Sequence, residues 1–126
     1  MTVRVKFRSE GIPGRYIWCP PADVARAFTG SAHMCAGIYG IGSGVGDIVD
    51  GECIIDFAEF TQLAATAVHG FSASDQGILR SLTLGFIPTS LVLIERSGHP
   101  APMMPGPDQE RAWTALRDQH AQVMPV

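Results

Sequence analysis

The sequence predicts an α+β protein in which a small, mainly antiparallel sheet is covered by three to four helices. Two observations lead to this prediction. The N-terminus alternates apolar and basic residues with a period of two, as a half-buried strand does, and later segments repeat apolar residues every three or four positions, as helices do. The chain has 126 residues, of which 46% are hydrophobic and 17% charged, so we expect one globular domain over residues 1–126.

The predicted sheet begins with an N-terminal hairpin. Apolar residues alternate with basic ones over residues 3–8, residues 11–14 (GIPG) have turn composition, and residues 15–19 (RYIWC) are rich in aromatic and β-branched side chains. A buried strand is predicted over residues 91–95, because this run is apolar on both faces, and residues 52–55 are a further short candidate. Exposed edges on so small a sheet also suggest a homodimer.

The first two predicted helices flank a glycine-rich loop. One runs from about 21 to 39, after a pair of prolines that suit a helix start, and ends at the loop of residues 40–46. The other begins at Asp56, whose side chain can accept a hydrogen bond from the backbone of Glu59 in a capping box, and ends near Gly70.

The second half of the chain leaves one alternative open. Residues 75–86 have helical periodicity, and the apolar residues that follow read either as a strand over 91–95 or as the continuation of one kinked helix over 75–95. A last helix is predicted from about 107 to 123.

The most informative feature is a run of negative charge. Between Arg26 and Arg80 there is no lysine or arginine, and five carboxylates fall in the segment GDIVDGECIIDFAEF: Asp47, Asp50, Glu52, Asp56 and Glu59. Charge segregation of this kind favours a small soluble non-catalytic interaction protein, such as an accessory, inhibitor or immunity-type factor. The predicted partner is a protein with a basic surface, bound through Asp47, Asp50 and Glu52.

The end of the same segment resembles the calcium-binding loop of the EF-hand family. With Glu59 at the last position of such a loop, Asp50, Glu52 and Asp56 fall at positions that ligate calcium, which makes these four residues candidate ligands of an irregular cation site. The first and sixth positions lack the acid and the glycine of the family. The preferred interpretation is therefore that Asp56 and Glu59 cap a helix and the others line a solvated turn, with no cofactor.

No catalytic motif is present, and an enzyme is the less favoured interpretation. The glycine-rich loop lacks the spacing of a dinucleotide fingerprint, and the four histidines lack zinc-site spacing. A small enzyme or ligand-binding domain stays an alternative, with a carboxylate from the acidic segment and a distant histidine or cysteine in one pocket.

The composition also bears on the location of the protein. Because the net charge is −3, we do not expect the protein to bind nucleic acid. The most apolar run is broken by Arg80, Gly85 and Pro88, which argues against a membrane span. Three widely spaced cysteines indicate a reducing compartment, so we expect a cytoplasmic protein.

Overall fold

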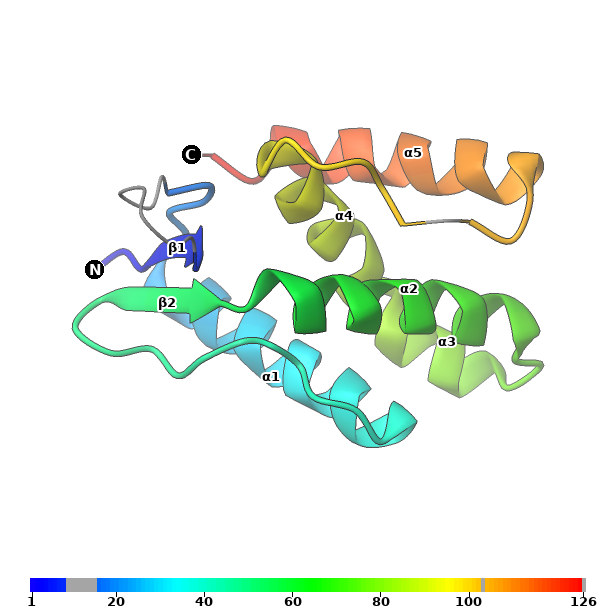
Figure 1. Ribbon diagram of the computed structural model, residues 1–126, viewed down its shortest axis with the longest axis horizontal. Helices are drawn as coiled ribbons and strands as arrows, with labels where there is room; N and C mark the ends of the chain where they lie inside the picture. Colours follow the sequence, from blue (N-terminus) through cyan, green and yellow to red (C-terminus); the bar gives the residue numbers. More distant parts are fainter. Residues whose placement is uncertain (9–15, 103, 126) are drawn as a thin grey trace.

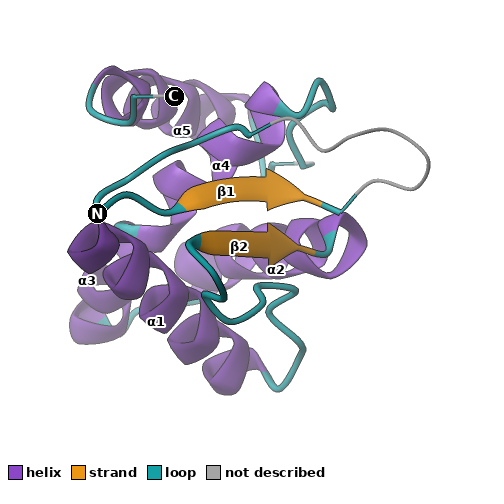
Figure 2. Ribbon diagram, turned by 90° about the vertical axis from the view of Figure 1, so that its left-hand side faces the viewer, coloured by secondary structure: helices purple, strands orange, loops and turns teal. Residues whose placement is uncertain are grey.

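The computed structural model describes residues 1–8, 16–102 and 104–125. Figure 2 shows the two strands side by side, with α2 behind them, α4 and α5 on one side and α1 on the other. The elements of the described residues follow in the order β1 (Arg4–Phe7), α1 (Ala22–Tyr39), β2 (Glu52–Ile55), α2 (Phe57–Ala73), α3 (Gly77–Leu84), α4 (Phe86–Arg96) and α5 (Pro107–Gln122) (Figure 1). The class is α+β.

The sheet is parallel, so the predicted antiparallel arrangement is wrong. β1 pairs with β2, which places Arg4 opposite Glu52 and Phe7 opposite Ile55. The connection between the two strands contains α1, and parallel neighbours need a crossover of this kind. The short strand predicted over residues 52–55 is confirmed as β2, but its partner lies far away in the sequence.

The second strand of the predicted hairpin is not formed. The turn at 11–14 and residue 15 lie outside the described residues, and the chain from Ile17 onward follows β1 only through isolated antiparallel bridges, such as that of Val5 with Trp18. Two prolines at positions 20 and 21 follow. Because proline has no backbone N–H, a regular ladder cannot continue along them.

Both outer edges of the sheet are covered by irregular segments. The Val5–Trp18 bridge protects the free edge of β1, and an antiparallel bridge between Val45 and Ile55 protects that of β2. Unpaired edges were the reason for expecting a homodimer, and these bridges remove that reason. Dimer formation remains a prediction, but exposed sheet edges no longer support it.

The strand predicted over residues 91–95 is wrong, because the run lies in α4. The alternative of one kinked helix over residues 75–95 is closer to the observed structure, because only Gly85 separates α3 from α4. α4 packs against α1, α2, α3 and α5, and every residue from Phe86 to Ile94 except Thr89 is buried. A helix that is surrounded on all sides is apolar all round, and over four residues it cannot be told from a buried strand.

Among the described residues, one helical stretch, Gly77–Arg96, is long and apolar enough to cross a membrane by length and composition alone. Half of its apolar window is buried in the protein, and the core helix of a soluble protein passes the same criterion. This is weak evidence for a membrane span. The cytoplasmic location stays a prediction.

The other predicted helices are present as α1, α2, α3 and α5. Asp56 caps α2 as expected, with its carboxylate accepting a hydrogen bond from the Glu59 N–H at 3.0 Å. The apolar stripe of α2, with Phe60 and Leu63 fully buried, faces α1 and α4. The acidic segment enters the sheet at the start of β2 and leaves it at the start of α2.

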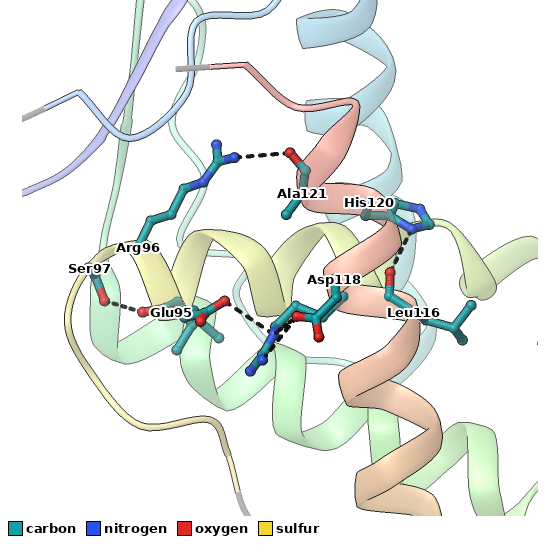
Figure 3. Close-up of polar contacts among 9 residues, drawn as sticks. Glu95, Arg96, Ser97, Leu116, Asp118, His120 and Ala121 are labelled. Atoms are coloured by element: carbon teal, nitrogen blue, oxygen red, sulfur yellow. Dashed lines mark hydrogen bonds and ion pairs between the residues drawn. The ribbon is translucent and has the colours of Figure 1, made fainter.

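Arg96, the last residue of α4, fastens distant segments together. Its guanidinium donates hydrogen bonds to the carbonyls of Ile17 at 2.9 Å, Met124 at 2.6 Å and Ala121 at 3.4 Å. Figure 3 shows the side chain extending from the end of α4 toward Ala121 at the end of α5. The C-terminus is thereby held against the segment that precedes α1.

Candidate functional site

The acidic segment begins with a tight turn into β2. Asp50 and Gly51 have φ values of 53° and 72°, and hydrogen bonds join Val49 and Glu52 in both directions, at 2.9 and 3.0 Å. Two central residues with positive φ are the requirement of a type I′ turn, for which Asp-Gly is a preferred pair. The Asp-Gly pair was therefore a turn signal. The sequence analysis preferred a solvated turn at Asp50 and kept a cation loop as the alternative. We call residues 47–50 the acidic turn.

Two carboxylates of the acidic turn face solvent. Asp47 and Asp50 are exposed, and neither has an ion pair with any residue that the structure describes. Between them, the side chain of Val49 is 62% exposed. The two backbone hydrogen bonds between Val49 and Glu52 fix the backbone of Val49 and Asp50 in the turn.

Glu52, the third predicted contact residue, is compensated inside the molecule. The Tyr16 hydroxyl donates a hydrogen bond to its carboxylate at 2.8 Å, and Arg4 and Lys6 of β1 lie 3.5 and 3.8 Å away. The hydrogen bond from Tyr16, followed by the two basic groups, lowers the pKa of Glu52 from its ordinary value. The parallel register brings these charges together, so Glu52 does not act with Asp47 and Asp50 as a free negative charge.

The four candidate cation ligands have separate roles. Asp50 belongs to the turn, Glu52 faces β1, Asp56 caps α2, and the Glu59 carboxylate lies beside Gly42, where an added Cβ would be 2.6 Å from Oε2. Within the described part of the chain, no group of three or more His, Cys, Asp or Glu residues could hold a metal ion. The geometry of an EF-hand loop is not reproduced here.

The glycine-rich loop packs against the start of α2. The Asp56 N–H donates to the Gly44 carbonyl at 2.7 Å, and Gly44 has a φ of 73°. A Cβ at this position would lie 2.7 Å from the Asp56 carbonyl oxygen and 2.8 Å from the Phe60 nitrogen, both backbone atoms. Glycine is required here by close approach, and the loop is a packed part of the fold.

Two of the three cysteines are withdrawn from solvent, whereas Cys19 is half-buried. Cys35 and Cys53 are buried, and burial raises the pKa of each thiol to about 11. At neutral pH both are protonated, and the thiolate is the reactive form. The nearly buried Ser43 hydroxyl lies 3.1 Å from His33 Nδ1 and accepts a hydrogen bond from the Val45 N–H, so it serves to shape the glycine-rich loop.

A family model described as a family of unknown function, DUF6086, matches residues 6–126. The chain belongs to the DUF6086 family. No curated protein matches the chain, and no solved structure does. For this DUF6086 protein, a function has to be argued from the site geometry.

A cavity of about 380 Å³ lies where β1 ends, α2 begins and α4 ends. Its lining comes from four separate stretches of this DUF6086 chain: Phe7, Arg8, Ile17, Phe57, Arg96, Ser97 and His99. The sequence analysis did not group these residues, and no spacing signal could have done so, because the tertiary fold alone brings them together.

Proposed function

We propose that the protein is a small non-catalytic interaction protein that binds a basic protein partner through the acidic turn. One observation carries this proposal: the turn presents two uncompensated carboxylates, Asp47 and Asp50, on either side of the exposed Val49. An apolar side chain surrounded by charged groups has the composition of the centre and rim of a protein interface. A turn that is already ordered also loses less conformational entropy on binding than a flexible loop would.

The proposal keeps two of the three partner-binding residues that were predicted from the sequence. Asp47 and Asp50 supply the attraction to a basic surface, while Glu52, at the start of β2, is bonded to Arg4 of β1 and to Tyr16. Complementary charges of this kind speed association and select against partners of the same sign.

A non-catalytic role is favoured by the state of the reactive groups. Cys35 and Cys53 are buried thiols with raised pKa values, and the Ser43 hydroxyl is engaged with the backbone of its own loop. The alternative of a small enzyme or ligand-binding domain draws its support from the cavity beside Arg96.

Capture of the partner from the native cell, with quantitative mass spectrometry, tests the proposal. The tagged full-length protein is compared with Asp47→Lys, which reverses one charge, and with Asp50→Asn, which removes one charge while tolerating the positive φ. Asp75→Lys is the matched control, since Asp75 is exposed in the connection between α2 and α3. We expect both turn variants to lower the recovery of one specific protein about tenfold.

Two results would oppose the proposal. The same proteins could be recovered at equal levels with the wild type and with Asp47→Lys, in which case the acidic turn takes no part in binding. Alternatively, Asp75→Lys could lower the recovery of the partner as much as Asp47→Lys does. Binding would then depend on the net charge of the protein and not on the acidic turn. Circular dichroism of each variant establishes that the fold is retained.

A further inference from the structure

We propose that the cavity between β1, α2 and α4 binds a small organic anion, consisting of a carboxylate or phosphate group on an apolar or aromatic body. The cavity volume of about 380 Å³ falls within the range of small-molecule sites, roughly 300–1,000 Å³. The site is distinct from the acidic turn and the inference does not depend on it. The charged residues that line the cavity are basic, whereas those of the acidic turn are carboxylates.

The lining has positive charge without compensation. Arg8 and Arg96 both line the cavity, together with His99, and no carboxylate lines it among the residues that the structure describes. Among the described residues, neither arginine has an ion-pair partner, whereas four other basic residues each face a carboxylate: Arg4, Lys6, Arg111 and Arg117. An anion in the cavity would supply the missing counter-charge.

Arg96 is held in place before any ligand arrives. The carbonyls of Ile17, Ala121 and Met124 accept hydrogen bonds from its two terminal nitrogens, which leaves the Nε–H and one Nη1–H without these partners. Burial lowers the pKa of Arg96 from its ordinary value, a sign that the charged form is incompletely solvated. A bound anion would offset that cost, and the fixed guanidinium would need no reorganisation to meet it.

His99 and the phenylalanines define the remaining walls. The ring of His99 lies on Phe57, with centroids 4.2 Å apart, and Phe7 meets Phe57 edge to face at 5.2 Å. The Ser97 hydroxyl donates to the Ile94 carbonyl, so the His99 Nδ1–H donates to Ser97 Oγ at 3.1 Å. In the neutral ring Nε2 is then an acceptor, so His99 contributes an aromatic wall beside Phe57 and the arginines supply the donors to an anion. Aromatic walls beside cationic groups favour a ligand with an apolar or aromatic body.

Three other hollows do not combine these features, and one of them, of about 450 Å³ on α5, has the carboxylates of Glu110 and Asp118 beside its arginine, Arg111. The remaining two are smaller. The first, of about 300 Å³, lies between α1, α4 and the C-terminus and has no arginine in its lining. The second, of about 290 Å³, lies between α2, α3 and α5 and has one arginine, Arg80, whose guanidinium is 4.5 Å from the ring of Phe71. The second hollow therefore offers a matched control for an arginine beside an aromatic ring.

Titration of the full-length protein with phenyl phosphate and with benzoate, followed by ¹H–¹⁵N NMR, tests the inference. Benzyl alcohol is the neutral control ligand. We expect saturable shifts of the amides of Arg8, Phe57 and Ser97 with at least one of the two anions. Arg8→Gln should weaken this binding about tenfold, because one charge-assisted hydrogen bond is lost. Arg80→Gln should leave it unchanged.

Arg8 is exposed and outside the core, so its replacement is not expected to unfold the protein, and His99→Leu provides a second independent variant. The inference is overturned if neither anion shifts these amides up to about 10 mM, a concentration that fills even a millimolar site. It is also overturned if benzyl alcohol binds as well as the anions, or if Arg8→Gln and His99→Leu both bind at the wild-type level.

Discussion

Replacing Arg96 with methionine should cost the protein a large part of its stability. Methionine keeps an unbranched side chain but removes every hydrogen bond that Arg96 donates. Those bonds join the end of α4 to Ile17 and to Met124, residues that lie 79 and 28 positions away in the sequence.

The size of the loss follows from the hydrogen-bond lengths. The bonds to Ile17 at 2.9 Å and Met124 at 2.6 Å are short, whereas the bond to Ala121 at 3.4 Å is long and is counted as weak. A hydrogen bond from a charged donor contributes about 1.5–3 kcal/mol. Because Arg96 is only half-buried, we use the lower end of that range. The two short bonds then give a loss of about 3 kcal/mol, out of roughly 5–15 kcal/mol for a typical domain.

Urea unfolding monitored by circular dichroism and by the fluorescence of Trp18 and Trp113 measures the loss. With a slope of about 2 kcal/mol/M, the unfolding midpoint should fall by about 1.5 M. Arg80→Met, which removes an exposed arginine from above a phenylalanine ring, should cost no more than about 1 kcal/mol. A loss for Arg96→Met below about 1 kcal/mol, or one no greater than for Arg80→Met, would refute the reasoning.

Two further predictions concern titratable groups. The hydrogen bond from Tyr16 and the basic side chains of β1 hold the pKa of Glu52 below 4.5 in the folded state, so their stabilising effect is present above pH 4.5 and is lost as the pH falls through the folded pKa. The stability difference between the wild type and Glu52→Gln, measured by urea unfolding, should therefore narrow on acidification, and a constant difference would contradict this. Burial raises the pKa of Cys35 and Cys53 to about 11, so iodoacetamide at neutral pH should label Cys19 first, as measured by mass spectrometry. Rapid labelling of Cys35 or Cys53 in the native protein would contradict the prediction that burial protects these thiols.

The helices were predictable because their signals are local. The spacing of apolar residues located α1, α2, α3 and α5, and the capping residue Asp56 was identified with its correct backbone partner. A helix forms its hydrogen bonds within one segment, so the residues that start and end it lie close in the sequence.

The strands were harder to predict because their partners are remote. The run at 91–95 is apolar on all sides since α4 is buried by its neighbours, and residues 15–19 lead into prolines that stop a regular ladder. The periodicity of residues 4–7 indicated a strand correctly but not which segment would pair with it. The pairing of β1 with β2 depends on the path of α1, which connects the two strands.

By itself, the sequence determined the positions of most helices, the existence of the acidic segment and the buried apolar stripe of α2. Only the tertiary structure decided which carboxylates keep their charge uncompensated. The parallel register sets Arg4 against Glu52, while Asp47 and Asp50 stay exposed on the acidic turn. It also decided that Arg96 would line a cavity in which none of the described lining residues is a carboxylate. Local hydrogen bonds are encoded by neighbouring residues, whereas charge compensation depends on contacts between segments that only packing brings together.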